Sequence, residues 1–421
     1  MKTALADFIK DTPAGQEADA ILRSCVHCGF CLASCPTYQL LGNELDSPRG
    51  RIYLMKQLLE GESVSDSTQL HLDRCLGCRA CESACPSGVQ YGRLLDIGRA
   101  VTETRVRRAP LVAAKRFLLN KVVPYPRRAA LLLKAAGFAR ALLPRRLRGQ
   151  LPGLPAPLPA AARLWPAPRH ARRVLLLQGC VQPALGAGIN PAAARVLDRV
   201  GISAVPVPGA GCCGALSQHL GAEADAHEQL RRNIDALWPG IEAGAEAVLM
   251  TSSACSAMFK DYGRLLAGDP QYAPRAARVS ELARDLSQLL ASESSGLKNA
   301  LLRARAAHGA WPATRVAFQA PCSLQHALRA AGVVEPLLLA AGFTLTGVDD
   351  GQRCCGSAGT YSILQPELSQ RLLAAKLEAL GRGAPEVIAT ANIGCLHHLR
   401  GATPTPVRHW IELVDERLGG G

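Results

Sequence analysis

The apolar positions of this chain follow one pattern in its second half and another in its first. Beyond residue 171, short apolar runs are separated by Gly, Pro and polar residues, which is typical of buried parallel strands. These runs are residues 174–177, 248–250, 316–318 and 387–389. Stretches between them, such as 191–200 and 324–341, mix apolar and polar residues at a helical period. The alternation predicts parallel α/β units over this part of the chain.

The N-terminal part shows a helical pattern instead. Residues 52–59 repeat apolar side chains at a helical period, directly after an expected turn at 47–50.

No run approaches the ~18 apolar residues of a membrane-spanning helix. Asp7, Lys10 and Glu17 do not fit the apolar core of a signal peptide. We therefore expect a protein of a reducing compartment, whose cysteines bind metal.

Eight of the sixteen cysteines form two copies of one signature, C-x2-C-x2-C-x3-C-P. This is the spacing of bacterial-type [4Fe-4S] proteins, in which the fourth cysteine of one copy binds the cluster held by the other. It assigns Cys25, Cys28, Cys31 and Cys85 to one cluster, and Cys75, Cys78, Cys81 and Cys35 to a second. Zinc usually takes two separated pairs of ligands, and a disulfide framework needs an exported protein, so both alternatives fit less well.

The other eight cysteines mark an internal repeat. In each copy a cysteine follows an apolar run, a Cys-Cys-Gly comes 32 residues later, and a last cysteine follows another run. The first copy holds Cys180, Cys212, Cys213 and Cys255, and the second holds Cys322, Cys354, Cys355 and Cys395. Because parallel α/β units present ligands beyond the carboxyl ends of their strands, each set should gather on one rim. Two facing rims would form a single site between the repeats.

The net charge of +14 is concentrated in one segment. Residues 99–150 hold fourteen Lys or Arg against one acid, Glu103, interleaved with apolar triplets. Such a segment could lie on an anionic membrane surface, or it could be a helical connector that packs on the protein or on a partner subunit. Aromatic residues are too sparse to favour nucleic-acid binding. Six prolines in residues 151–170 then predict an extended linker.

These patterns predict a mainly helical two-cluster ferredoxin-like N-terminal domain followed by two repeated α/β cysteine-rich units. The expected divisions are 1–100 for the two [4Fe-4S] clusters, 101–170 for the basic helical segment and Pro-rich linker, 171–300 for the first unit and 301–421 for the second. The stretch 209–212 lacks the third glycine of a dinucleotide-binding fingerprint. We therefore expect neither a flavin or nicotinamide site nor a catalytic residue in this chain.

Distinctive stretches flank the cysteines, at residues 35–42, 46–53, 85–91, 354–361 and 407–412. Through them the chain resembles, over nearly its whole length, the iron–sulfur subunits of bacterial glycolate oxidase, within the wider family of cysteine-rich (CCG) proteins. The resemblance implies a complex in which separate FAD-binding flavoprotein subunits oxidise glycolate to glyoxylate. This chain would relay their electrons to a respiratory-chain acceptor such as quinone. The basic segment 99–150 and the absence of a spanning run, rather than the resemblance, predict a peripheral protein on the cytoplasmic side of the bacterial inner membrane.

The resemblance leaves two questions open. In the heterodisulfide reductase relatives each full repeat ends in C-x2-C and binds an unusual cluster, whereas here Met258 and His398 stand at the last position. His398 could ligate iron, cap a helix or face solvent, and the repeat cysteines could hold a third iron–sulfur cluster, form a redox site or be buried structural thiols. The alternative functions are an electron-transfer subunit of a related L-lactate or glycerol-3-phosphate dehydrogenase, and a disulfide-reducing enzyme.

Overall fold

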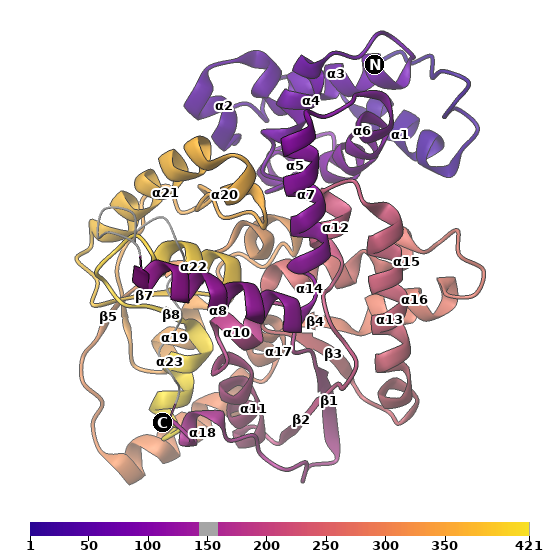
Figure 1. The fold of residues 1–421 in the computed structure, drawn as a ribbon. Helices are drawn as coiled ribbons and strands as arrows, with labels where there is room; N and C mark the ends of the chain where they lie inside the picture. The colour runs from indigo at the N-terminus through magenta and orange to yellow at the C-terminus, as the bar shows by residue number, and fades with distance from the viewer. Residues whose placement is uncertain (143–158, 421) are drawn as a thin grey trace.

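The computed structural model describes residues 1–142 and 159–420, in which a helical N-terminal part lies against two α/β units (Figure 1). Three of the six prolines of the expected linker, and the end of the basic segment, lie outside the described residues. Within the described ranges, no helix combines the length and the apolar content that crossing a membrane requires.

Short helices and the loops between them form the N-terminal part. They are α1 (Pro13–Ser24), α2 (Pro36–Leu41), α3 (Pro48–Leu59), α4 (Asp66–Asp73), α5 (Ala80–Ser83) and α6 (Tyr91–Arg105), with a 3-10 turn at Glu44–Asp46. A proline begins each of α1, α2 and α3, where the N–H that proline lacks would have no helical partner. The expected turn at 47–50 is the capped start of α3, because the Ser47 hydroxyl accepts a hydrogen bond from the Gly50 N–H at 2.9 Å.

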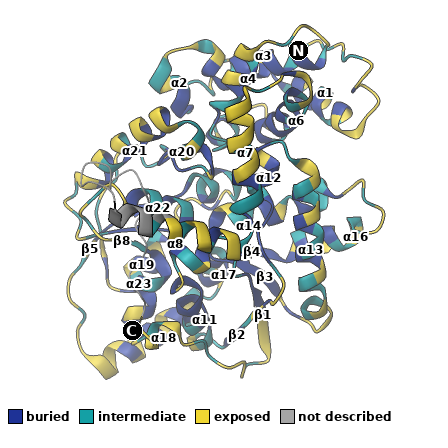
Figure 2. Ribbon diagram, viewed as in Figure 1, coloured by how far each residue is buried: buried dark blue, intermediate teal, exposed yellow. Residues whose placement is uncertain are grey.

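The basic segment is helical where it is described, in α7 (Pro110–Val122) and α8 (Pro126–Leu142). Helix α7 runs from the N-terminal part toward the α/β units, and α8 lies across them (Figure 1). Much of α7 and the start of α8 is exposed to solvent (Figure 2). The other face of α7 is held by ion pairs, among them Lys121 Nζ with Asp225 Oδ1 of the first unit at 2.8 Å.

Each α/β unit contains a four-stranded parallel sheet, and the two sheets have the same topology. The first has the order β2-β1-β3-β4, with β1 (Arg172–Leu176), β2 (Ile202–Pro206), β3 (Ala247–Met250) and β4 (Ala283–Asp285). The second has the order β6-β5-β7-β8, with β5 (Arg315–Gln319), β6 (Thr344–Leu345), β7 (Val387–Thr390) and β8 (Val407–His409). The repeat read from the cysteine spacing is thus also a repeat of structure.

Helices cover both sheets. Those of the first unit are α10 (Gln182–Leu185), α11 (Ile189–Arg199), α12 (Ala215–His219), α13 (Glu223–Glu242), α14 (Ser253–Lys260), α15 (Tyr262–Leu265), α16 (Ala273–Leu282), α17 (Leu286–Ser292) and α18 (Ser294–His308). Those of the second are a π-helical turn (Ser323–Ala327), α19 (Glu335–Ala340), α20 (Tyr361–Leu364), α21 (Pro366–Gly381), α22 (Ile393–Arg400) and α23 (Trp410–Arg417). The expected divisions after residues 100 and 300 fall inside α6 and α18.

One apolar core runs through both α/β units. Along β1 the side chains alternate, so that Val174 and Leu176 enter this shared core whereas Leu175 faces a second core under α13 and α16. Helix α11 of the first unit packs against α23 of the second. Each fully buried Val or Leu contributes roughly 1.5–3 kcal/mol, so the shared core holds the two units together.

Candidate metal centres

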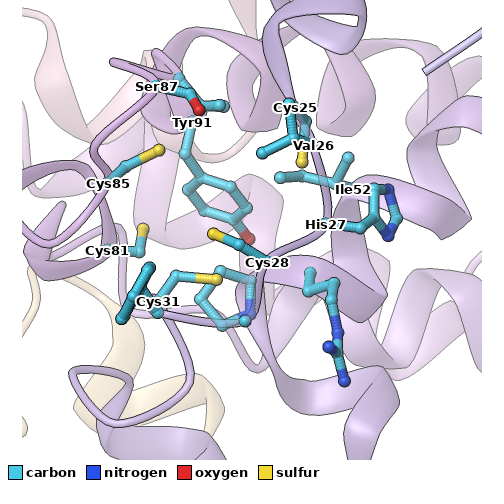
Figure 3. Close-up of a pocket in the computed structure, with 15 residues that line it drawn as sticks. Cys25, Val26, His27, Cys28, Cys31, Ile52, Cys81, Cys85, Ser87 and Tyr91 are labelled. Carbon is cyan, nitrogen blue, oxygen red and sulfur yellow. The ribbon is translucent and has the colours of Figure 1, made fainter.

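The first cysteine loop runs between α1 and α2 and folds around a pocket (Figure 3). The loop can turn tightly because His27 and Gly29 have φ angles of 56° and 87°. The pocket is lined by cysteines of both signatures, namely Cys25, Cys28, Cys31, Cys81 and Cys85. The four residues assigned to the first cluster, which we call the outer set (Cys25, Cys28, Cys31, Cys85), therefore share one cavity.

The outer set reaches the surface at one residue, since Cys25 is buried and Cys31 and Cys85 are half-buried. Cys28 is exposed, and Val26 and Phe30 on either side of it are exposed as well. Burial raises the pKa of the Cys31 thiol to about 11. Iron binds the thiolate, so the thiols of this set must lose their protons when a cluster binds.

The cysteines assigned to the second cluster, here called the inner set, are Cys35, Cys75, Cys78 and Cys81. Cys35, Cys75 and Cys81 are buried, and Cys78 is half-buried. Both Cys78 and Cys81 lie close enough to Cys75 and Cys35 for their charges to interact. Burial, and after it the nearby Cys322 thiol, raises the pKa of Cys78.

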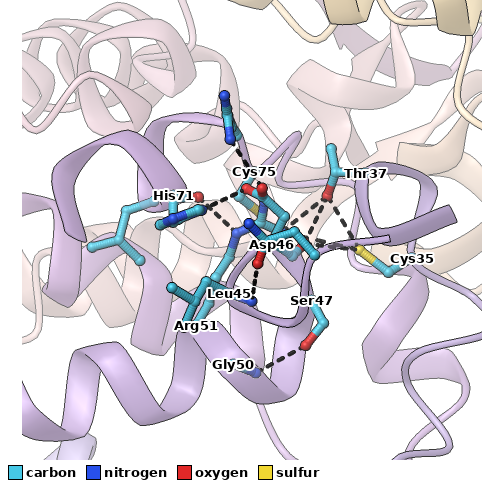
Figure 4. Close-up of polar contacts among 12 residues, drawn as sticks. Cys35, Thr37, Leu45, Asp46, Ser47, Gly50, Arg51, His71 and Cys75 are labelled. Carbon is cyan, nitrogen blue, oxygen red and sulfur yellow. Dashed lines mark hydrogen bonds and ion pairs between the residues drawn. The ribbon is translucent and has the colours of Figure 1, made fainter. Parts of the chain in front are cut away.

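Several residues that are not expected cluster ligands contact the inner set, and the sequence alone gave them no role. The Tyr91 hydroxyl donates a hydrogen bond to Cys75 Sγ at 3.6 Å, and Arg99 Nη2 donates to the Cys75 carbonyl at 2.7 Å. Arg51 Nη1 lies 4.0 Å from Cys35 Sγ (Figure 4). The distinctive stretch 46–53 contains Arg51, but its spacing gave no sign of a contact with sulfur.

The cysteines of the first repeat gather beyond the carboxyl ends of β1, β2 and β3. The Cys180 thiol is within hydrogen-bonding reach of Cys212, and Cys213 is within reach of Cys255. Hydrogen bonds from Cys180 and Cys213, with help from Arg232, hold the pKa of Cys212 well below its usual range. This rim therefore favours a thiolate at Cys212.

The second repeat gathers its cysteines in the same place relative to its sheet. Cys355 Sγ lies 3.3 Å from Cys395 Sγ, and Cys322 is within hydrogen-bonding reach of Cys354. Hydrogen bonding to Cys354 and burial raise the pKa of Cys322. Lys376, a fully buried cation, lies beside this set and donates to the Gly351 carbonyl at 2.9 Å.

Each repeat set thus gathers on its own rim, and the rims meet through polar groups rather than through sulfur. Ser253 Oγ lies 2.7 Å from Ser323 Oγ, and the Ser253 N–H donates to the Ala391 carbonyl at 3.2 Å. His398, the residue at the departure from C-x2-C, has Nε2 at 3.2 Å from Ser369 Oγ. Burial lowers its pKa to about 4, so the ring is neutral.

The N-terminal part contacts both α/β units. Arg79 Nη2 pairs with Asp261 Oδ2 of the first unit at 2.9 Å, and the contacts with the second unit lie next to its cysteine rim. Ser83 Oγ hydrogen-bonds with His326 Nδ1 at 2.9 Å, and the Tyr361 hydroxyl donates to the Arg74 carbonyl at 3.1 Å. Cys78 of the inner set interacts electrostatically with Cys322 and Cys354 of the second repeat. The inner set therefore lies between the outer set and the cysteines of the second repeat.

The chemistry of these donor sets fits iron–sulfur clusters. In the described ranges, no three His, Cys, Asp or Glu side chains lie close enough to hold one metal ion. A cubane cluster has a different requirement, because each of its four thiolates binds a different iron. The four cysteines of the outer set around a common space, which Arg49 also lines, meet that requirement.

Comparisons with known proteins agree with this arrangement. Residues 21–89 match the 4Fe-4S dicluster domain, and residues 174–260 and 316–400 each match the cysteine-rich domain. The molecule is therefore an iron–sulfur protein in which a ferredoxin-like domain precedes two cysteine-rich repeats.

The relatives narrow the class. The chain is 50% identical to the glycolate oxidase iron-sulfur subunit of Escherichia coli (strain K12), over 99% of both chains. It is 32% identical to the probable glycolate oxidase iron-sulfur subunit of Bacillus subtilis (strain 168), over 90% of this chain and 88% of the other. Lactate utilization protein A of the same strain is 25% identical over 58% of this chain and 100% of its own length. The chain belongs to the family of glycolate oxidase iron–sulfur subunits, as its cysteine signatures and the stretches that flank them predicted.

Proposed function

We propose that this chain is the electron-transfer subunit of a complex that oxidises glycolate to glyoxylate. It takes electrons from FAD-binding flavoprotein subunits and passes them to a respiratory acceptor such as quinone. The observation that carries the proposal is the shared pocket of the outer set, in which cysteines of two distant signatures face one space. We assign substrate oxidation to the partner subunits, because we expect neither a flavin site nor a catalytic residue in this chain.

The outer set and the inner set would each hold one [4Fe-4S] cluster. When bound, these clusters supply one-electron transfer between a two-electron flavin and its acceptor. The chain itself binds and shields. Burial of Cys35, Cys75 and Cys81 keeps water from the inner set, and the Tyr91 hydroxyl is directed at Cys75. The repeat cysteines offer a third position, either for a further cluster or for redox chemistry of the thiols themselves.

The test is the metal content of cysteine variants of the full chain. The loaded protein should contain about eight iron and eight sulfide in the N-terminal part. Cys28→Ser and Cys78→Ser should each remove about half of that iron and abolish electron transfer, and each should remove a different spectroscopic signal. Full iron and full activity in either variant would contradict the ligand assignment. Iron beyond eight that disappears in Cys213→Ser or Cys355→Ser would place a third cluster in a repeat.

The proposed divisions of the chain follow the expected ones, with the boundaries at 100 and 300 moved to the ends of α6 and α18. The proposed location is the cytoplasmic face of the inner membrane, with α7 and α8 on the lipid surface. This location is supported by exposed apolar side chains among basic ones, such as Leu111 and Phe117 beside Lys115 on α7.

A further inference from the structure

Arg51 of α3 is a buried cation at the centre of a polar network (Figure 4). Its side chain is 1% exposed. Nε donates to the His71 carbonyl at 2.7 Å, Nη1 donates to Thr37 Oγ1 at 3.1 Å, and Nη2 donates to Asp46 Oδ1 at 3.2 Å. The guanidinium is thus held in one orientation by partners on three other segments.

That orientation brings positive charge to the sulfur atoms of the inner set. Nη1 lies 4.0 Å from Cys35 Sγ, and Thr37 Oγ1 lies 3.3 Å from the same sulfur. The Cys75 sulfur is near enough to interact with the guanidinium as well. In a buried environment a charge at this range acts far more strongly than it does in water.

The network leaves this positive charge only partly balanced. Asp46 is fully buried, and its carboxylate also pairs with Arg74 Nη1 at 3.0 Å and lies 3.0 Å from His71 Nδ1. One carboxylate therefore serves two guanidinium groups. The second guanidinium, that of Arg74, is partly exposed, so Arg51 is the cation that the protein shields from solvent.

The outer set has a different cation beside it. Arg49 approaches the loop at Gly29, but its side chain is 33% exposed and its Nε is paired with Glu44 Oε1 at 2.8 Å. Solvent and a partner of its own screen this charge, so its effect on the outer set is weak. Cys28 is also exposed, so water reaches the outer set directly.

We propose that Arg51 makes the inner site the better electron acceptor of the two and so sets the direction of electron flow through the chain. A reduced cluster carries one more negative charge, which a nearby buried cation stabilises. Transfer takes one electron from the outer site and places it on the inner site, with no bond broken and no proton moved. Electrons from the flavoprotein then arrive on the exposed Cys28 side and leave beside Cys322. This inference rests on the proposed function, since it needs two clusters.

The test is a redox titration of the full-length, cluster-loaded chain, followed by electron paramagnetic resonance. Arg51→Gln should lower the ratio of reduced to oxidised inner cluster at a fixed potential by about tenfold, which is 59 mV for one electron. Asp46→Asn removes the balancing anion and should shift the same couple in the opposite direction. A residue that acted only by holding the fold would give shifts of one sign, with loss of iron, in both variants.

Arg49→Gln is the matched control, and it should leave the inner couple where it is in the unmodified protein. If Arg51→Gln loses its iron, two other variants decide. Asp46→Asn should still raise the reduction potential of the inner couple, and the charge-conserving Arg51→Lys should nearly preserve that potential. Equal shifts of both couples, or no upward shift in Asp46→Asn, would overturn the inference. Fewer than two reducible clusters in the unmodified chain would instead overturn the proposed function.

Discussion

At the scale of single residues, Gly50 shows how the cysteine sites depend on positions that bind nothing. Gly50 lies in the first turn of α3, and a Cβ there would overlap the carbonyl oxygen of Glu44. Glu44 begins the turn that carries Asp46, the partner of Arg51. The close approach of Gly50 to this turn therefore fixes Arg51 relative to the inner set.

We expect Gly50→Ala to lower the free energy of unfolding by about 1–3 kcal/mol, because the turn at Glu44 must move to admit the methyl group. The inner set should also lose iron more readily than the outer set. Anaerobic denaturant unfolding and iron analysis measure the two effects. Gly381→Ala, at the exposed end of α21 with open space around it, is the control and should be neutral or stabilising by up to about 1 kcal/mol. Similar losses in both variants would show that the close contact is unimportant.

Residue spacing alone placed the N-terminal cysteines in two loops and the other eight in a repeat. Spacing could not reveal Arg51 or Tyr91, because a contact with sulfur across 16 residues of sequence depends on how α3 and α6 pack. It also could not show that Lys376 lies beside the second repeat set, since a helical lysine is ordinarily a surface residue.

At the scale of elements, β8 and α23 join the second unit to the first. His409 at the end of β8 is fully buried, and its Nδ1 accepts a hydrogen bond from the Ile411 N–H at 3.3 Å, which caps α23. Nε2 is left to donate to the Thr251 carbonyl of the first unit at 2.9 Å. Burial lowers the pKa of His409 to about 4. A neutral ring is therefore part of the contact between the units.

This contact should make stability depend on pH. An unfolded histidine titrates near 6.5, so between pH 6.5 and about 4 the unfolded chain takes up a proton that His409 in the fold does not. The stability that His409 provides is fully present above pH 6.5 and is lost as the pH falls, at up to about 1.4 kcal/mol per unit. Urea unfolding of the protein and of His409→Asn at pH 7.5, 6.5 and 5.5 measures this loss. The difference between the two should shrink at low pH, and parallel curves would contradict the assignment.

Apolar periodicity located four of the eight strands that the structure describes, namely β1, β3, β5 and β7, and helix α11 lies over the expected 191–200. The single helix expected at 324–341 is wrong. The structure has a π-helical turn and α19 there, separated by Arg329 and Gly332 at φ angles of 51° and 74°. Residues in the left-handed conformation end a helix. Gly332 is a sequence signal for that conformation, but the pattern of apolar positions does not indicate it at Arg329.

At the scale of the whole molecule, the two repeats are one body on which the N-terminal part is seated. The sequence indicated two similar units, but the core that joins them was not predictable, because side chains of β1 and β5 enter it from different repeats. The contact between the N-terminal part and the second unit was not predictable either; there Leu40 and Leu76 pack around Tyr361. Such contacts depend on surfaces that form only after each part has folded.

The exposed side of α7 and α8 yields the last prediction. Leu111, Phe117 and Leu131 stand out from these helices at 86%, 64% and 67% exposure, among basic residues that include Arg127 and Arg128. Between Glu103 and Asp198 the sequence contains no acid. A face that is apolar and purely cationic suits a bilayer with anionic lipids, where each basic residue adds about 1 kcal/mol of attraction that salt screens.

We therefore expect the protein to sediment with anionic vesicles at low salt and to be released at high salt. Arg127→Glu with Arg128→Glu should weaken this binding, since it reverses charge on the lipid-facing side of α8. The control is Arg303→Glu with Arg382→Glu, which makes the same change in total charge on exposed residues of α18 and of the loop after α21. If the control releases the protein equally, the attraction is that of the net charge alone. If high salt or the α8 variant instead strips off the flavoprotein subunits and leaves vesicle binding intact, the surface of α7 and α8 is a subunit interface.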